Sequence, residues 1–169
     1  MTIKLASIRL GMLTPSSNTV LEPYTVAMLA DLPNISAHFS RFKVLKISLE
    51  DDALGQFNCK PMLDAADLLA DANVQTICWN GTSSGWLGFD KDHALIAEIE
   101  LRTGIKACSS ILAMNELLKK FKVKRIAFVT PYLTEIQERI LTNYRAAGFE
   151  IAAEKHLGDP GNFSFATYS

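Results

Sequence analysis

The fold of this 169-residue chain is decided by the stretch Thr76-Ile77-Cys78-Trp79-Asn80-Gly81-Thr82-Ser83-Ser84-Gly85-Trp86. Residues 74–79 are largely apolar, uncharged and partly β-branched, which is typical of a strand covered on both faces of a parallel sheet. Two glycines and three hydroxyl residues follow, and their N–H and O–H groups suit a carboxylate. Because ligands bind at the carboxyl ends of parallel strands, the stretch predicts either a carboxylate-binding loop or an ordinary polar turn.

Strands and helices alternate on both sides of this stretch. Capping signals support the boundaries, with Ser109 or Ser110 beginning one helix and Gly104 ending another. The sequence therefore predicts an α/β fold with a mostly parallel sheet, whose βα loops all open on one edge. The predicted strands are 8–13, 35–42, 74–79, 105–108, 125–130 and 151–153, and the predicted helices are about 20–32, 60–72, 90–103, 110–121 and 133–147.

The two ends of the chain share a pattern. Residues 10–15, LGMLTP, match residues 126–131, IAFVTP, at an offset of 116, and Glu22 and Glu138 each follow the corresponding proline by seven positions. The match predicts an internal duplication, with chance similarity of two strand-loop units as the alternative. A duplication implies two pseudosymmetric parallel-sheet lobes, a first over residues 1–120 and an incomplete second over 121–169. An incomplete sheet leaves open edges, so we expect the isolated chain to be unstable or to self-associate.

Composition excludes several classes of function. The 17 basic and 18 acidic residues form no long run of one sign, which argues against nucleic-acid binding. No apolar segment approaches the roughly 20 residues of a membrane span, and the N-terminus lacks a signal-peptide pattern. Three cysteines without CxxC spacing and three scattered histidines predict a cytoplasmic protein with no disulfide framework and no metal. Glycine-rich nucleotide motifs are absent, and Asp90-Lys91-Asp92 is interpreted as a solvated turn.

Two similar loops facing one cleft suit proton transfer at a carbon beside a carboxylate. Such a reaction passes through an enediolate, and each hydrogen-bond donor aimed at it contributes about 3–4 kcal/mol. The side chains of Thr82, Ser83 and Tyr132 and the N–H groups around Gly81 are the predicted donors. Other residues of the same sheet edge, predicted to bind substrate, are Pro15, Ser16 and Ser109.

Four motifs in order resemble the aspartate/glutamate racemase superfamily, and most closely its arylmalonate decarboxylase and maleate cis-trans isomerase branch. They are Pro15-Ser16-Ser17-Asn18-Thr19, Gly81-Thr82-Ser83, Thr130-Pro131-Tyr132 and Gly161-Asn162-Phe163. The resemblance covers essentially the whole chain and about two thirds of a typical member. It implies two α/β lobes around one cleft and chemistry without a cofactor, with one cysteine per lobe in the racemases and maleate isomerases.

The resemblance also assigns residues. Gly81 falls at the first-lobe cysteine position, where arylmalonate decarboxylases also have glycine. Thr82, Ser83 and Tyr132 would form a dioxyanion hole, and Asn18 and Asn162 match asparagines that contact substrate carboxylates. A glycine at position 81 favours single-cysteine decarboxylation, with the remaining cysteine expected in the second lobe beyond Ser169.

The predicted function is therefore a cofactor-independent enzyme that acts on a small carboxylate or dicarboxylate, with arylmalonate-like decarboxylation first. Cis-trans isomerisation or racemisation is the enzyme alternative and would need another thiol, for which Cys108 is the candidate because it lies at the active edge beside a helix N-terminus. A non-catalytic carboxylate-binding module stays open, as does a homo-oligomer. Trp79 is expected in the core, whereas Trp86 is either a core residue or a wall of the pocket.

Overall fold

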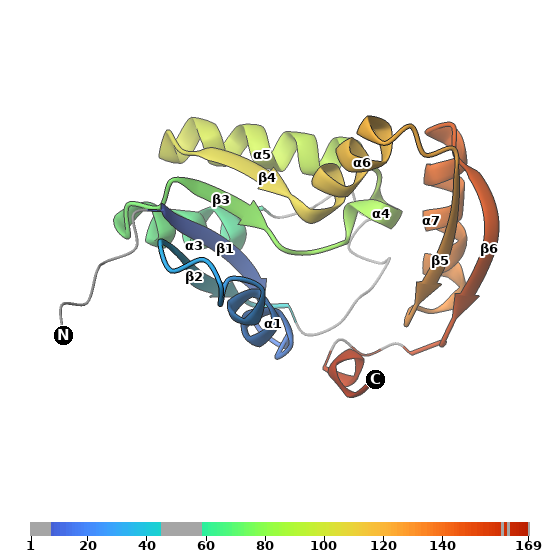
Figure 1. Cartoon of the computed structure of the whole chain (residues 1–169), viewed down its shortest axis with the longest axis horizontal. Helices are drawn as coiled ribbons and strands as arrows, with labels where there is room; N and C mark the ends of the chain where they lie inside the picture. Colours follow the sequence, from blue (N-terminus) through green and yellow to red (C-terminus); the bar gives the residue numbers. More distant parts are fainter. Residues whose placement is uncertain (1–7, 45–58, 160, 162, 169) are drawn as a thin grey trace.

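The computed structural model describes residues 8–44, 59–159, 161 and 163–168. It is an α/β structure with two parallel sheets, as the sequence predicts (Figure 1). The elements are β1 (Ile8–Pro15), α1 (Leu21–Met28), β2 (Ile35–Phe42), α3 (Lys60–Asp71), β3 (Thr76–Trp79), α4 (Ser84–Leu87), α5 (Phe89–Thr103), β4 (Lys106–Ser109), α6 (Ser110–Lys120), β5 (Arg125–Thr130), α7 (Thr134–Ala146), β6 (Glu150–His156) and the 3₁₀ helix η1 (Ser164–Thr167).

The larger sheet has the strand order β2-β1-β3-β4, and all of its neighbouring strands are parallel. The smaller sheet pairs β5 with β6, also in parallel. The two sheets are separate, and η1 returns from β6 toward α1 (Figure 1). The predicted boundary between lobes at residues 120 and 121 falls between these sheets and stays a prediction.

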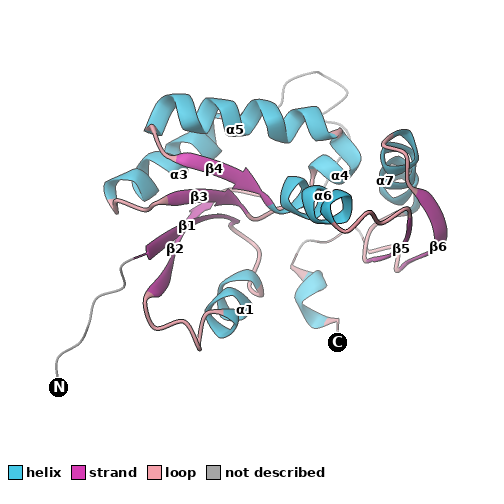
Figure 2. Cartoon of the chain, turned by 45° about the horizontal axis from the view of Figure 1, so that its top comes forward, coloured by secondary structure: helices cyan, strands magenta, loops and turns pink. Residues whose placement is uncertain are grey.

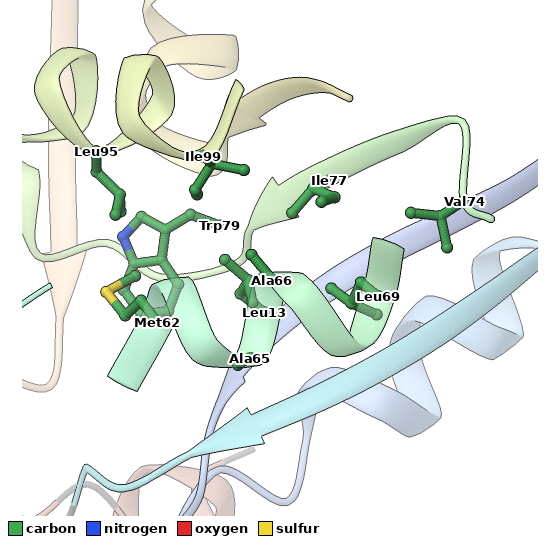
Figure 3. Close-up of a cluster of buried hydrophobic side chains, with 10 residues drawn as sticks. All are labelled: Leu13, Met62, Ala65, Ala66, Leu69, Val74, Ile77, Trp79, Leu95 and Ile99. Atoms are coloured by element: carbon green, nitrogen blue, oxygen red, sulfur yellow. The ribbon is translucent and has the colours of Figure 1, made fainter. Parts of the chain in front are cut away.

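One face of the four-stranded sheet is covered by α3 and α5, and α1 lies on the other side (Figure 2). The core between the sheet and the helices α3 and α5 contains Leu13, Ile77 and Trp79 from the strands, with Leu69 and Ile99 from the helices (Figure 3). Leu13 and Ile77 are completely inaccessible to solvent. Their burial explains why β1 and β3 read as nearly continuous apolar runs.

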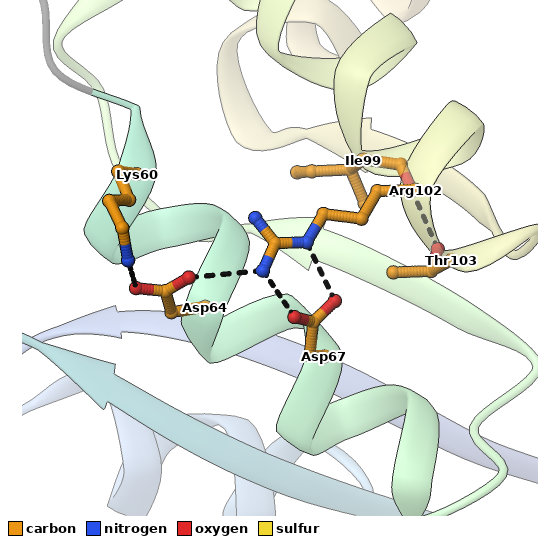
Figure 4. Close-up of polar contacts among 6 residues, drawn as sticks. All are labelled: Lys60, Asp64, Asp67, Ile99, Arg102 and Thr103. Atoms are coloured by element: carbon orange, nitrogen blue, oxygen red, sulfur yellow. Dashed lines mark hydrogen bonds and ion pairs between the residues drawn. The ribbon is translucent and has the colours of Figure 1, made fainter.

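Ion pairs also join α3 to α5. The Arg102 guanidinium donates to both Asp64 and Asp67, and Lys60 pairs with Asp64 one helical turn away (Figure 4). These side chains are exposed, so each pair contributes at most about 1 kcal/mol. The apolar core therefore dominates the packing of the two helices.

A second core surrounds α7. Ile136, Ile140 and Tyr144 of this helix pack against Trp86 of α4, and Ile126 of β5 lies at the margin of the same cluster. The Asn143 amide donates to the Gly85 carbonyl at 3.0 Å. These contacts fix the β5–α7–β6 unit against the loop that follows β3.

The predicted duplication corresponds to two units of the same arrangement. Both β1–α1–β2 and β5–α7–β6 are a strand, a helix and a second strand parallel to the first. Pro15 ends β1, and the corresponding Pro131 directly follows β5. Duplication predicts this arrangement, but strand-helix-strand units recur throughout parallel α/β folds, so the duplication stays a prediction.

Several boundaries differ from the sequence predictions. The first helix ends at Met28 instead of continuing to about residue 32, because residues 29–31 form a turn. The short helix α4 was not predicted, since four residues carry no periodic signal. The β4 strand is shifted by one residue, and β6 extends to His156. Gly104 does end α5 in the left-handed conformation, and Ser109 does cap α6.

Candidate functional site

The loops that follow β3 and β5 meet through two hydroxyl groups. Thr82 lies just after β3 and Tyr132 just after β5, and the Thr82 Oγ1 and Tyr132 Oη atoms are 2.7 Å apart. Tyr132 lies 50 residues further along the chain. Both loops leave the carboxyl ends of their parallel strands, which is where such folds bind ligands.

Tyr132 is enclosed by aromatic rings. Its ring contacts Trp86 edge-to-face at 5.0 Å between centroids and Phe165 of η1 at 5.5 Å. Burial raises the pKa of Tyr132 above its ordinary value, and the hydrogen bond with Thr82 opposes this shift only in part. The phenol is therefore protonated at neutral pH and can donate a hydrogen bond.

A buried carboxylate, that of Asp92, holds the segment that follows Thr82 through a hydrogen bond. Ser84 Oγ donates to Asp92 Oδ2 at 2.7 Å, and the Asp92 side chain is only 3% exposed. Burial raises the pKa of Asp92, although hydrogen bonds from Ser109 and Ser84 favour its ionised form. The prediction that Asp90-Lys91-Asp92 is a solvated turn is thus wrong for Asp92, which faces inward from the first turn of α5.

The loop that follows β1 lines a cavity. Asn18 Oδ1 accepts hydrogen bonds from the N–H groups of Val20 and Leu21 at 3.0 and 2.8 Å. Asn18, Thr19 and Val20 form one wall of a cavity of about 210 Å³, and Phe165 and Ala166 of η1 form the other. Phe165 also touches the ring of Tyr132, but Thr82 and Tyr132 are not among the described residues that line this cavity.

Other predicted residues are placed differently. Pro15 is buried at the end of β1, and Ser16 Oγ is occupied by the backbone of Val44, to whose carbonyl it donates and whose N–H it accepts. Ser83 is the residue before α4, and its carbonyl accepts from the N–H groups of Trp86 and Leu87. Asn162 lies outside the described residues.

Ser109 requires a correction. Its side chain is completely buried, and its Oγ accepts from the Leu112 N–H at 3.1 Å as the cap of α6. The same hydroxyl hydrogen-bonds Asp92. Ser109 therefore supports the fold below the loop and does not present a group to a substrate.

Cys108 faces Cys78 across the β3–β4 pair. A hydrogen bond from the Cys78 thiol lowers the pKa of Cys108 to about 7, and the same contact together with burial raises the pKa of Cys78. Asn80 Oδ1, 3.2 Å from the Cys78 sulfur, is a second acceptor for the single proton of this thiol. Among the described residues, no hydrogen bond joins Cys108 to Thr82 or Tyr132.

Three contributors to the site were not found from the sequence. They are Asp92, Asn143 and Phe165, which act through contacts with residues far away in the chain. Only the acidic character of the first turn of α5 could have indicated Asp92, and exposed first turns carry the same signal. Among the described residues, no group of three or more His, Cys, Asp or Glu side chains could hold a metal ion, and no helix is long and apolar enough to cross a membrane.

The fold and the site define an α/β protein in which loops from two parallel sheets meet at a pair of hydroxyl groups. The model of the arylmalonate decarboxylase family matches residues 11–159, and the chain belongs to this family within the Asp/Glu racemase-like superfamily. The resemblance inferred from the four motifs is thereby confirmed.

The curated relatives include maleate isomerases, two of which come from Geobacillus stearothermophilus and Pseudomonas putida. The protein from Geobacillus stearothermophilus is 27% identical over 167 residues, which is 91% of this chain and 65% of the relative. The protein from Pseudomonas putida KT2440 is 27% identical over 179 residues, which is 95% of this chain and 67% of the relative. The chain thus spans about two thirds of the length of these relatives.

Solved structures show the same fold. A Nocardia farcinica maleate cis-trans isomerase, a cysteine-to-serine mutant with a covalently bound succinylcysteine intermediate, superposes with a TM-score of 0.84 at 23% identity, covering 98% of this chain and 69% of that one. Unliganded arylmalonate decarboxylase gives a TM-score of 0.73 at 21% identity over 96% of this chain and 66% of that one. At these identities the likeness establishes the fold.

Proposed function

We propose that the protein is a cofactor-independent enzyme that converts a small carboxylate or dicarboxylate through an enediolate, with decarboxylation of an arylmalonate-like acid as the reaction. The observation that carries the proposal is the 2.7 Å contact between Thr82 Oγ1 and Tyr132 Oη. One of the two hydroxyl groups donates to the other in this structure, and once a carboxylate replaces that bond each hydroxyl can donate to one carboxylate oxygen. The match to the arylmalonate decarboxylase family supports the choice of reaction.

The reaction requires hydrogen-bond donors at the carboxylate oxygens on which negative charge develops. When the bond to the departing carboxyl carbon breaks, CO₂ leaves and its bonding electron pair passes into the remaining carboxylate, forming an enediolate. Hydrogen bonds from Thr82 and the protonated Tyr132 phenol stabilise that charge. The α-carbon then takes one proton, which the family resemblance assigns to a cysteine of the second lobe.

The cavity between the loop that follows β1 and η1 offers space for the rest of such a substrate. Asn18 lines it, and the side-chain amide N–H groups of Asn18 have no hydrogen-bond partner among the described residues. They provide donors for a second carboxylate. Phe165 supplies an apolar wall, which favours a substrate with a hydrocarbon or aryl group.

Maleate isomerisation is the second candidate, favoured by the names of the curated relatives. In this chain it would need a thiol at the site. Cys108 has a thiol whose pKa is lowered to about 7, but this thiol is hydrogen-bonded to Cys78. Gly81 in place of a cysteine keeps decarboxylation as the leading proposal.

Proton NMR in D₂O with the full-length protein, which carries the second-lobe cysteine that the resemblance implies, distinguishes the reactions. With phenylmalonate we expect phenylacetate carrying one deuterium at the α-carbon; conversion of maleate into fumarate would instead support isomerisation. Tyr132→Phe and Thr82→Val each remove one donor and should reduce kcat by about 10²–10³-fold. Tyr24→Phe on α1 is the matched control, because Tyr24 is 66% exposed and should leave kcat unchanged.

Binding must be measured beside turnover. If phenylmalonate and maleate bind to a full-length protein that carries the second-lobe cysteine and neither is converted, the carboxylate-binding module replaces the enzyme. Equal kcat values for Tyr132→Phe, Thr82→Val and the unmodified chain would contradict the proposed role of the hydroxyl pair.

A further inference from the structure

Gly81 has no room for a side chain. A Cβ atom at this position would lie 2.0 Å from Cζ2, 2.3 Å from Cη2 and 2.6 Å from Cε2 of the Trp79 ring. Unbonded carbon atoms approach one another only to about 3.5–4.0 Å. The indole therefore occupies the space that a side chain at position 81 would need.

The Trp79 ring cannot easily move aside. It is 5% exposed and packs within the main core, near Met62 and Leu95 (Figure 3). The Phe42 ring lies against it at 5.4 Å between centroids. Because protein interiors are close-packed, shifting the indole would displace several core side chains.

The backbone does not explain the glycine. Left-handed φ values, which favour glycine, occur at other glycines, and Gly81 is not one of them. A nearby glycine, Gly85 of α4, offers a comparison. A Cβ atom there would lie 3.8 Å from Ile140 and 3.9 Å from Ile111, which are ordinary contacts. The restriction at position 81 thus comes from Trp79.

We propose that Trp79 is a specificity-determining residue that keeps position 81 free of a side chain and so excludes a thiol from this wall of the site. The proposal rests on the proposed function, in which the site is formed at the neighbouring Thr82 and at Tyr132. The family resemblance places the first-lobe cysteine of racemases and maleate isomerases at position 81. Trp79 thereby restricts the chain to proton transfer from one side.

A double-mutant cycle between positions 79 and 81 tests the steric part without any assay of activity. Gly81→Ala should lower Tm by about 4–10 °C because of overpacking, whereas the control Gly85→Ala should change it by less than about 2 °C. Trp79→Phe removes the ring atoms nearest Gly81 but keeps an aromatic ring in the core. In the Trp79→Phe background, Gly81→Ala should lower Tm by less than about 2 °C.

Placing a thiol at position 81 tests the functional part. Gly81→Cys in the Trp79→Phe background should react with iodoacetamide at residue 81, located by peptide mass spectrometry, and phenylmalonate should slow this reaction. If Trp79→Phe prevents folding, Trp79→Leu serves in its place. An unchanged Tm for Gly81→Ala, or an equal loss in both backgrounds, would overturn the role of Trp79, whereas alkylation that phenylmalonate does not slow would count against the proposed site alone.

Discussion

The two strand-helix-strand units of the molecule have related sequences and opposite patterns of burial. Leu13 in β1 is completely buried, whereas Val129, its counterpart 116 residues later in β5, is 79% exposed. The helices show the reverse, since Tyr24 of α1 is 66% exposed and its counterpart Ile140 of α7 is 5% exposed. The two copies of the repeat therefore differ in environment at these two pairs of positions.

The neighbours of each unit explain the difference. β1 lies between β2 and β3 and faces the α3 and α5 core, so its last five residues are buried. β5 pairs only with β6 among the described strands, and α7 covers one face of this pair, so exposed and half-buried residues alternate along β5. Burial here depends on the layers packed around a unit more than on the unit itself.

The largest expected effect tests the strands. Leu13→Ala should lower the free energy of unfolding by about 2–5 kcal/mol, because it opens a cavity in the core. Val129→Ala should change it by less than about 0.5 kcal/mol, because the Val129 side chain already contacts water. Urea unfolding followed by circular dichroism measures both.

A large loss for Val129→Ala would break the comparison, since it would show that β5 is covered in solution. Sedimentation velocity shows whether a second copy of the chain covers β5. The open sheet edges predict self-association, and a monodisperse monomer with a sharp melting transition would contradict that expectation.

A smaller effect is expected for the helices. Ile140→Val removes one buried methylene group from α7 and should lower the free energy of unfolding by about 0.5–1.5 kcal/mol. Tyr24→Phe on the exposed face of α1 should leave it unchanged within about 0.5 kcal/mol. Equal losses in the two variants would show that α1 is packed against a partner.

The smallest effect is a difference in pH dependence. Burial raises the folded-state pKa of Asp92, so the contribution of Asp92 to stability is present at low pH and is lost as pH rises through that pKa. The free energy of unfolding of Asp92→Asn should therefore increase relative to that of the unmodified chain as pH rises. Hydrogen bonds from His156 and Gln137 lower the pKa of Glu154, whose contribution is present above the unfolded pKa and is lost as pH falls through the folded pKa.

Unfolding curves from about pH 3 to about pH 7 for Asp92→Asn and Glu154→Gln check these signs. Glu154→Gln should be less stable than the unmodified chain near neutral pH and approach it in acid. Parallel pH dependences for the two variants would contradict the assigned environments.

Much of the architecture was predictable because it follows from local signals. Apolar runs marked the strands, and Gly104 and Ser109 marked two helix ends. The site was predictable only in part. Thr82 and Tyr132 follow strands of two separate parallel sheets, and the structure brings them together. Ser109 follows a strand as well but is buried as a helix cap.

By itself the sequence determined the order of strands and helices, the repeated unit and the hydroxyl-rich loop after β3, since periodicity and turn residues act over a few positions. Tertiary structure alone decided that Asp92 is buried beneath that loop, that the Trp79 ring fills the space beside Gly81, and that Leu13 and Val129 have opposite exposure. These properties arise from packing between segments far apart in the chain, where neither spacing nor composition carries a signal.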